Sequence, residues 1–313
     1  MKYYSGPELN QIFDFPSLIE ALRVGFTEEF LVPERMHIDY QNPDDDSENT
    51  LLLMPAIRIG DVSGVKLVNV APANSSRGMA SIQGVYYLMN STTGQPKAIM
   101  DAKSLTNWRT AAASALAASY LADPGSQRLL MVGTGSLAPF LIEAHLVNRP
   151  IDELIVYGRS AAKAEALGQR FSGRLKKVSI ETDLEEAVRR VDIISVATFS
   201  STALIKGRWL RPGQHLDLVG SFKPNMREAD DEVMRRSSIY VDVKQTAPRE
   251  SGDLAIPMAH GVISQKDIKG DLFQLCRGEV KGRRSSQEIS LFKSVGHALE
   301  DLVAARLISQ KNQ

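Results

Sequence analysis

The stretch from Arg128 to Ala138, RLLMVGTGSLA, constrains the fold of this chain more than any other. An apolar run of strand length ends at Val132 and meets Gly-x-Gly-x-x-Ala, after which apolar residues recur at helical spacing. We therefore predict a strand, a tight turn and a helix. In such a turn Gly133 permits the bend, Gly135 lets a ligand approach bare backbone, and Ala138 lets the helix pack on its strand.

This arrangement suits a dinucleotide, because a pyrophosphate needs backbone N–H groups at the positive end of a helix. A glycine-rich turn without a ligand is the alternative. A second strand is expected at 153–157, and its end lies about 20 residues further on, where a ribose-reading residue belongs. No acid follows it to accept hydrogen bonds from a ribose 2′-hydroxyl, whereas Arg159 and Ser160 suit a 2′-phosphate. We therefore predict NADPH as the preferred cofactor, with NADH possible; a solvated Arg159 at a helix start is the alternative.

Composition and charge restrict the partners. The 313 residues are 43% hydrophobic and 24% charged, as in a globular protein of about two domains. Lys plus Arg and Asp plus Glu each number 37, so no overall field favours nucleic acid or a membrane surface. We see neither a signal peptide nor an apolar run near the ~18 residues of a membrane span. A single cysteine, Cys276, fits a cytoplasmic location, and the histidines lack metal-ligand spacing, so we expect no metal.

The expected elements change in character along the chain. A helix begins after Asp14, and β-like segments follow, at 51–57, 62–70, 82–89 and 97–100. Ser104 is expected to cap a helix over 105–121. Strands and helices then alternate, which favours a parallel sheet and an α/β fold. Beyond the second strand they are expected at 161–171, 177–180, 184–190, 192–197, 215–219 and 239–243. A last helix, over 287–307, could return to the first domain.

Two cations stand where local structure disfavours them. Lys66 lies within an apolar strand, where a buried ammonium is costly unless an anion or an exposed face compensates it. Arg109 is expected in the first turns of its helix, where the helix dipole opposes a cation. A bound anion would explain both positions. An outward-facing lysine and a surface salt bridge are the alternatives.

Seven stretches, taken with their order and spacing, resemble the ornithine cyclodeaminase/μ-crystallin family. They are VKLVN at 65–69, TGQP at 93–96, RTAAAS at 109–114, the loop from Gly133, VGS at 219–221, ESGD at 250–253 and LFKSVG at 291–296. The resemblance implies a homodimer and two domains. A doubly wound Rossmann domain that binds NAD(P) would occupy 122–292, and a discontinuous α+β domain for substrate binding and dimerisation would occupy 1–121, completed by 293–313.

The resemblance also assigns site residues. Arg35, Lys66 and Arg109 would line the substrate site around a carboxylate. The cofactor would be surrounded by Ser81, Arg109, Thr110, Gly133, Thr134, Gly135, Ser136, Leu137, Arg159, Ser160, Thr198, Val219, Ser221 and Ser294.

One departure distinguishes activities within the family. Cyclodeaminases place a catalytic aspartate two residues after the glycine that is Gly220 here, and this chain has Phe222 at that place. Phenylalanine cannot move a proton, and the segment from Gly220 to Glu228 looks like the ketimine-reductase branch. The resemblance therefore implies reduction of cyclic imino acids, such as Δ1-pyrroline-2-carboxylate and Δ1-piperideine-2-carboxylate, to proline and pipecolate.

In that reaction, hydride from the cofactor would reach the C=N carbon of the ketimine. Arg35 and Arg109 would hold the substrate carboxylate, and Lys66 would contact this carboxylate or relay the proton near the imine nitrogen. The alternatives are an ornithine cyclodeaminase, an alanine-type amino-acid dehydrogenase and a μ-crystallin-like ligand-binding protein that is not an enzyme.

Overall fold

The computed structural model describes residues 1–44 and 47–311. The chain divides into two compact units: unit 1 is Met1–Thr110 with His297–Gln313, and unit 2 is Ala111–Gly296. Helix α3, Ala102–Leu121, continues from unit 1 into unit 2. The units divide after Thr110, within α3, and after Gly296, just before α11, rather than after residues 121 and 292.

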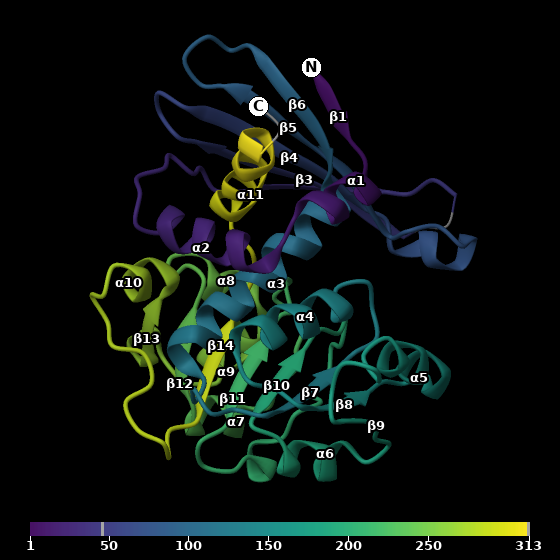
Figure 1. Ribbon diagram of the computed structural model, residues 1–313, viewed down its shortest axis with the longest axis vertical. Helices are drawn as coiled ribbons and strands as arrows, with labels where there is room; N and C mark the ends of the chain where they lie inside the picture. The colour runs from purple at the N-terminus through teal and green to yellow at the C-terminus, as the bar shows by residue number, and fades with distance from the viewer. Residues whose placement is uncertain (45–46, 312–313) are drawn as a thin grey trace. The chain divides into compact units, whose positions relative to one another are not determined.

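Unit 1 is a six-stranded sheet, in the order β1-β6-β5-β4-β3-β2, with helices against it (Figure 1). The pairing is antiparallel except for β1 with β6. The helix α11 packs against β3, β4, β5 and β6 and against α2. Besides α3, the elements are β1 Lys2–Tyr4, α1 Gly6–Ile12, α2 Phe15–Gly25, β2 Met36–Gln41, β3 Glu48–Ile57, β4 Val62–Val70, the 3-10 helix Pro72–Arg77, β5 Ile82–Asn90, β6 Pro96–Asp101 and α11 Ala298–Lys311.

Alternation explains how this sheet buries one face. Along β4 every second residue is buried, from Val62 through Gly64, Lys66 and Val68 to Val70. This is the pattern of a strand with one side on the core. A lysine therefore shares the buried face with three valines, which places its ammonium in the core of unit 1.

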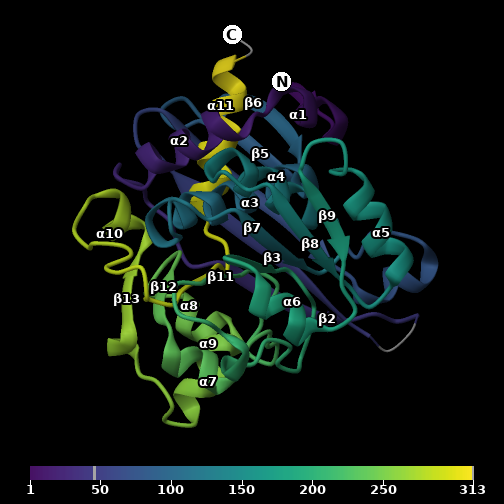
Figure 2. The same cartoon turned by 60° about the horizontal axis from the view of Figure 1, so that its bottom comes forward.

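Unit 2 is an eight-stranded sheet, in the order β13-β12-β14-β11-β10-β7-β8-β9, and every strand pair in it is parallel. Figure 2 shows β7, β8 and β9 side by side, with α5 next to β8 and β9. The elements are β7 Arg128–Val132, α4 Ala138–Asn148, β8 Glu153–Tyr157, α5 Ala161–Gln169, β9 Lys177–Ile180, α6 Leu184–Arg190, β10 Ile193–Val196, the 3-10 helix Gly207–Trp209, β11 His215–Leu218, α7 Asp231–Arg236, β12 Ser238–Val241, α8 Ala247–Glu250, α9 Gly252–Ala259, the 3-10 helix Gln265–Asp267, β13 Ile268–Asp271, α10 Leu272–Cys276 and β14 Ser290–Lys293.

The strand order contains a reversal that locates ligand sites in this fold. The chain runs outward from β7 through β8 to β9, and β10 then pairs with the other side of β7. In open parallel sheets, ligands bind outside the carboxyl ends of the strands at such a reversal. The predicted α/β fold with a doubly wound parallel sheet is confirmed, and its switch point lies between β7 and β10.

The last helix differs from its prediction. Residues 290–293 form β14, which lies between β11 and β12 with all four residues buried, and α11 begins only at Ala298. The expected helix over 287–307 is therefore wrong in its first half. Ile289, Phe292 and Val295 happen to fit a helical period, and a short fully buried strand has no alternation to contradict it. Gly296, with φ +81°, separates strand from helix.

Two smaller expectations also fail. Ser104 does not cap α3; the helix begins at Ala102, and the carboxylate of Asp101 accepts from the N–H of Ser104 at 2.7 Å. The β-like segment expected over 51–57 begins earlier, because β3 starts at Glu48. Across the described ranges, no helix has both the length and the apolar character to cross a membrane.

Candidate active site

Lys66 forms a buried ion pair in unit 1. Its side chain leaves β4 towards the core, and the residue is 3% exposed. The Nζ atom lies 2.9 Å from Oδ1 and 2.8 Å from Oδ2 of Asp301, and 3.4 Å from Oγ1 of Thr106. An outward-facing lysine, one alternative left by the sequence, is therefore excluded.

Arg109 shares the same carboxylate. Its Nε donates to Oδ1 of Asp301 at 3.0 Å, and its Nη1 donates to Oε2 of Glu300 at 2.7 Å. The guanidinium is buried, so these ion pairs are not the surface contact considered above. The hydrogen bonds of the guanidinium to these two acids are thus made by Nε and Nη1.

The expected place of Arg109 in the first turns of its helix is wrong. Because α3 begins at Ala102, Arg109 is the eighth residue of the helix, and the dipole falls off within the first turn. The protein's own acids also remove the need for an external anion at Lys66. The assignment of both cations to the substrate site therefore stays a prediction from the family.

The acids come from the start of α11. Glu300 and Asp301 lie in the first turn of that helix, where the dipole favours negative charge, and both are fully buried. Neither acid was expected from the sequence to belong to the site. The signal was two adjacent acids in a run of otherwise apolar residues, Ala298, Leu299, Leu302 and Val303, which are all buried here.

The cluster shifts the pKa of its members. Burial lowers the pKa of Lys66 to about 8, because the charge of Asp301 only partly offsets the loss of solvation and nearby Arg109 and Arg35 lower it further. Asp301 is lowered in pKa: burial would raise it, but the charges of Lys66 and Arg109 outweigh that effect. The pKa of Lys66 therefore lies near the range in which an amine can exchange a proton with a substrate.

Three other predicted residues belong to unit 1. Arg35 is half-buried, and its charge also lowers the pKa of His297, which burial brings to about 4. Arg35 thus lies within electrostatic reach of both Lys66 and His297. Ser81 is half-buried and its carbonyl accepts from the N–H of Ala71 at 2.8 Å, while Thr110 is buried.

The glycine turn of unit 2 follows its predicted logic. Gly133 has φ +113°, and a Cβ there would lie 2.5 Å from the carbonyl oxygen of Ala197. A Cβ at Gly135 would have no atom within 4 Å, so the backbone is bare on that side. Ala138 is buried, and α4 starts without a side-chain cap; the N–H of Ala138 donates to the carbonyl of Gly135 at 3.1 Å and that of Phe140 to the carbonyl of Leu137 at 3.0 Å. These features fit the pyrophosphate of a dinucleotide.

The other residues predicted in this turn surround that bare backbone. Ser136 is exposed, and Thr134 and Leu137 are half-buried. A Cβ on Gly158 would lie 2.7 Å from Cγ2 of Thr134, so the end of β8 lies beside the turn.

Arg159 and Ser160 follow directly on this strand. Both are exposed, and the Ser160 hydroxyl caps α5 by accepting from the N–H of Lys163 at 3.4 Å. Their position at a helix start beyond β8 is where a ribose substituent is expected.

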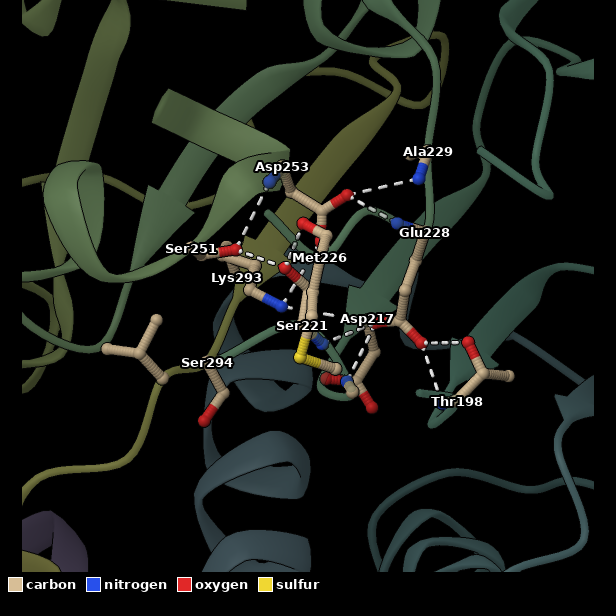
Figure 3. A network of polar contacts seen from close by, with 12 residues as sticks. Thr198, Asp217, Ser221, Met226, Glu228, Ala229, Ser251, Asp253, Lys293 and Ser294 are labelled. Atoms are coloured by element: carbon tan, nitrogen blue, oxygen red, sulfur yellow. Dashed lines mark hydrogen bonds and ion pairs between the residues drawn. The ribbon is translucent and has the colours of Figure 1, made fainter. Parts of the chain in front are cut away.

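Thr198 and Ser221 belong to one network of polar contacts, shown in Figure 3. The hydroxyl of Thr198 donates to Glu228, and that of Ser221 lies 2.8 Å from the Ser251 hydroxyl. Val219 is buried, and its N–H donates to the carbonyl of Val196. No role was expected for Glu228 from the sequence, although it ends the segment that resembles the ketimine-reductase branch.

Ser294 and Phe222 complete the predicted set. Ser294 is buried and donates to Oδ2 of Asp242 at 3.4 Å. Phe222 is half-buried and packs edge-to-face on Phe199, with ring centroids 6.0 Å apart. Cys276, the one cysteine of the sequence, is half-buried. The described residues include no group of three or more His, Cys, Asp or Glu that could hold a metal ion.

Comparison with known proteins agrees with this architecture. The chain is 35% identical over 314 residues to the Δ1-pyrroline-2-carboxylate reductase of Colwellia psychrerythraea, covering 99% of both chains. A structure of the Thermococcus litoralis Δ1-pyrroline-2-carboxylate reductase in complex with NADH and L-proline superposes with a TM-score of 0.94 at 32% identity, over 99% of this chain and 97% of that one. An archaeal alanine dehydrogenase dimer with bound NAD gives 0.92 at 27% identity, over 99% and 97%. The model of the ornithine cyclodeaminase/mu-crystallin family matches residues 14–313, and the chain belongs to that family.

Proposed function

We propose that this chain is a nicotinamide-dependent reductase of cyclic ketimine acids, which converts Δ1-pyrroline-2-carboxylate or Δ1-piperideine-2-carboxylate to proline or pipecolate. The observation that carries the proposal is Lys66: a buried amine with its pKa lowered to about 8, beside a guanidinium, in a chain whose other unit has a dinucleotide turn. Relatives named Δ1-pyrroline-2-carboxylate reductase support this substrate class.

The reaction adds a hydride and a proton across the C=N bond, and the nicotinamide supplies the hydride when bound. Lys66 carries a proton below pH ~8, and we assign it the protonation of the imine nitrogen. Its ion pair with Asp301 holds the ammonium in place. Its N–H groups bond to Oδ1 of Asp301 at 2.9 Å and to Oγ1 of Thr106 at 3.4 Å, and Oδ2 of Asp301 lies 2.8 Å away.

Arg109 and Arg35 would bind the substrate carboxylate. Two nitrogens of Arg109 are fixed by Asp301 and Glu300, which holds the guanidinium plane and presents Nη2 in one orientation. We therefore favour Lys66 as proton donor and the arginines as carboxylate ligands, a choice that the sequence left open.

A second candidate function is amino-acid dehydrogenation of the alanine type, which the likeness to the archaeal alanine dehydrogenase favours. Ornithine cyclodeamination fits less well. Phe222, which stands where the resemblance would place a catalytic carboxylate, packs on Phe199 and has no group that could transfer a proton.

We propose NADPH as the preferred cofactor. Arg159 and Ser160 are exposed at the start of α5, where a guanidinium, a hydroxyl and the positive end of a helix suit a 2′-phosphate. The change Arg159→Ala should raise the KM for NADPH about tenfold or more and leave that for NADH within about twofold, because one charge-assisted bond contributes roughly 1.5–3 kcal/mol. Equal losses for both cofactors would show that Arg159 does not read the phosphate.

The activity is tested by following NADPH and NADH consumption with five- and six-membered cyclic ketimine acids. Pyruvate with ammonia tests the alanine-type reaction, and ornithine with NAD⁺ tests cyclodeamination through released ammonia. We expect turnover of the ketimines far above the other two. Robust ammonia release from ornithine would overturn the branch assignment, and binding without turnover of any substrate would favour a μ-crystallin-like ligand-binding protein.

The assembly and location are proposals as well. We infer a homodimer, since an archaeal relative is described as a dimer, and light scattering on the purified chain tests it. We place the protein in the cytoplasm because its one cysteine suits a reducing compartment, and fractionation of the source cells tests this.

A further inference from the structure

A carboxylate joins the loops that follow β10 and β11. The Oε1 atom of Glu228 accepts from the N–H of Thr198 at 2.7 Å and from its hydroxyl at 2.8 Å, as Figure 3 shows. The Oε2 atom accepts from the N–H of Gly220 at 2.7 Å and from that of Ser221 at 3.3 Å. The side chain is fully buried, so each oxygen is bonded to one of the two loops rather than to solvent.

These loops lie at the switch point of the sheet. The carbonyl of Ala197, directly before Thr198, lies 2.5 Å from where Gly133 would carry a Cβ. A Cβ on Gly220 would lie 2.0 Å from the carbonyl oxygen of Thr198 and 2.5 Å from Oε1 of Glu228. The loop after β10 therefore touches both the glycine turn and the loop after β11, and the Glu228 carboxylate lies between the loops after β10 and β11.

The carboxylate is held in a buried charge cluster. Lys293 Nζ lies 3.3 Å from Oδ2 of Asp253 and 3.9 Å from Oε2 of Glu228, and all three residues are fully buried. Oδ1 of Asp253 accepts from the N–H of Glu228 at 2.7 Å and of Ala229 at 3.0 Å. Burial raises the pKa of Glu228 to about 7, although the positive charge of Lys293 lowers this pKa. The negative charge of Asp253 raises it further, and the hydrogen bonds from Thr198 lower it. Removing two carboxylates and one ammonium from water costs free energy of folding. Replacing such buried ion pairs with apolar residues often causes no loss of stability.

We propose that Glu228 is a positioning residue for the nicotinamide half of the dinucleotide. Glu228 fixes the loops after β10 and β11 in the shape that this half binds. The inference rests on the proposed function, because it requires the chain to bind a nicotinamide dinucleotide. A doubly wound sheet binds the dinucleotide with two mononucleotide halves. The half from β7 to β9 takes the adenosine end, so β10, β11 and β14 take the nicotinamide end.

The substitution Glu228→Gln tests the role with almost no change in size. All four groups that hydrogen-bond to the carboxylate donate to it, and three of them are backbone N–H groups that cannot accept. An amide nitrogen facing Gly220 and Ser221 would meet two donors. Facing Thr198, it could donate to the hydroxyl but would leave that residue's N–H without an acceptor. Either orientation loses at least one hydrogen bond that shapes the loops.

The readout is ligand affinity, measured by isothermal titration calorimetry on the full chain. NADH and NADPH span both halves, whereas ADP and 2′,5′-ADP occupy the adenosine half alone. We expect Glu228→Gln to weaken the dinucleotides about tenfold or more, which is 1.4 kcal/mol, and the fragments less than twofold. If Glu228 contributed only to overall stability, Glu228→Gln would weaken the dinucleotides and the adenosine fragments to the same extent.

Asp192→Asn is the matched control. This carboxylate accepts from the N–H groups of Gln127 and Arg128 at the amino ends of the strands, the opposite edge of the sheet. It should leave all four affinities within twofold. If Glu228→Gln does not fold, Glu228→Asp, which cannot reach both loops, replaces it under the same criteria.

The outcomes separate the two proposals. Wild-type protein that binds neither dinucleotide overturns the proposed function together with this inference. Wild-type protein that binds them, with Glu228→Gln unchanged or with dinucleotides and fragments weakened equally, overturns the role of Glu228 alone.

Discussion

Replacing Lys66 by methionine tests both the stability cost of its burial and the proton donation that we propose for it. Methionine is unbranched like lysine but one atom shorter, and it lacks the ammonium. Asp301 then retains Arg109 as its partner at 3.0 Å, so the change does not leave the carboxylate without a counter-charge. The variant should fold, because the position becomes one more apolar residue on the buried face of β4.

The magnitude follows from the pKa. A lysine of ordinary pKa 10.5 that is lowered to about 8 in the folded chain costs stability below pH ~8, where both states carry the proton. Between pH 8 and 10.5 the unfolded chain binds more protons than the folded one, so the free energy of unfolding rises with pH. One proton bound by the unfolded chain alone adds about 1.36 kcal/mol for each step of one in pH, so wild type should gain about 2 kcal/mol from this group between pH 7 and pH 9.5.

Lys66→Met should not show this gain. Urea unfolding of both proteins at the two pH values gives the test, with the difference between variant and wild type as the measured quantity. That difference should shift by about 2 kcal/mol in favour of wild type as the pH rises. An identical difference at both pH values would refute the lowered pKa of Lys66.

The same variant should lose kcat/KM for the ketimine by about ten- to a hundredfold while NADPH affinity stays unchanged. Lys103→Met, which removes an exposed lysine from α3, is the control. It should keep turnover, and its stability at pH 7 should stay within about 0.5 kcal/mol of wild type. Full activity in Lys66→Met would remove Lys66 from the site.

Two further predictions concern the proton and the glycine turn. In wild type, kcat/KM should fall as the pH rises through about 8, because Lys66 then loses the proton it donates; a profile that stays level to pH 9.5 would exclude it as the acid. Gly133→Ala should destabilise the chain by roughly 1–3 kcal/mol or more, because of its φ of +113° and the carbonyl 2.5 Å from the new methyl group. Gly135→Ala meets no atom within 4 Å, so it should leave the Tm unchanged yet weaken dinucleotide binding about tenfold, and unchanged affinity would mean that no pyrophosphate contacts that backbone.

Sequence patterns predicted those elements of the fold that can be recognised from their own residues, without their neighbours in space. The strand β4 shows its period of two within nine residues, and β8 is a short apolar run that ends at a glycine; the bounds of both strands agree with the prediction. The segment Ser290–Lys293 was not predicted as a strand. A central parallel strand buried on both faces has no period of two, and only its neighbours β11 and β12 show that it is a strand.

The site was predictable only in part, because its partners lie far apart in the sequence. Lys66 was recognised as a cation in an apolar strand, but the acid that compensates it is 235 residues away. Glu228 lies 30 residues from Thr198, and nothing local marks it as an acceptor for two loops. A pattern thus identifies a charge that needs an explanation, and the fold supplies the partner.

The internal acids change how the substrate must be recognised. If Lys66 and Arg109 awaited an external anion, the site without substrate would hold two uncompensated buried cations, and the folded chain would depend on its ligand. Asp301 and Glu300 instead neutralise them within unit 1, so the site can exist before the substrate arrives. If Arg109 binds the substrate as we propose, a ketimine carboxylate would gain less from net charge than from the orientation of Nη2, which the hydrogen bonds of Nε and Nη1 determine. Such a site discriminates by geometry, and it can release an amino-acid product that carries the same carboxylate as the substrate.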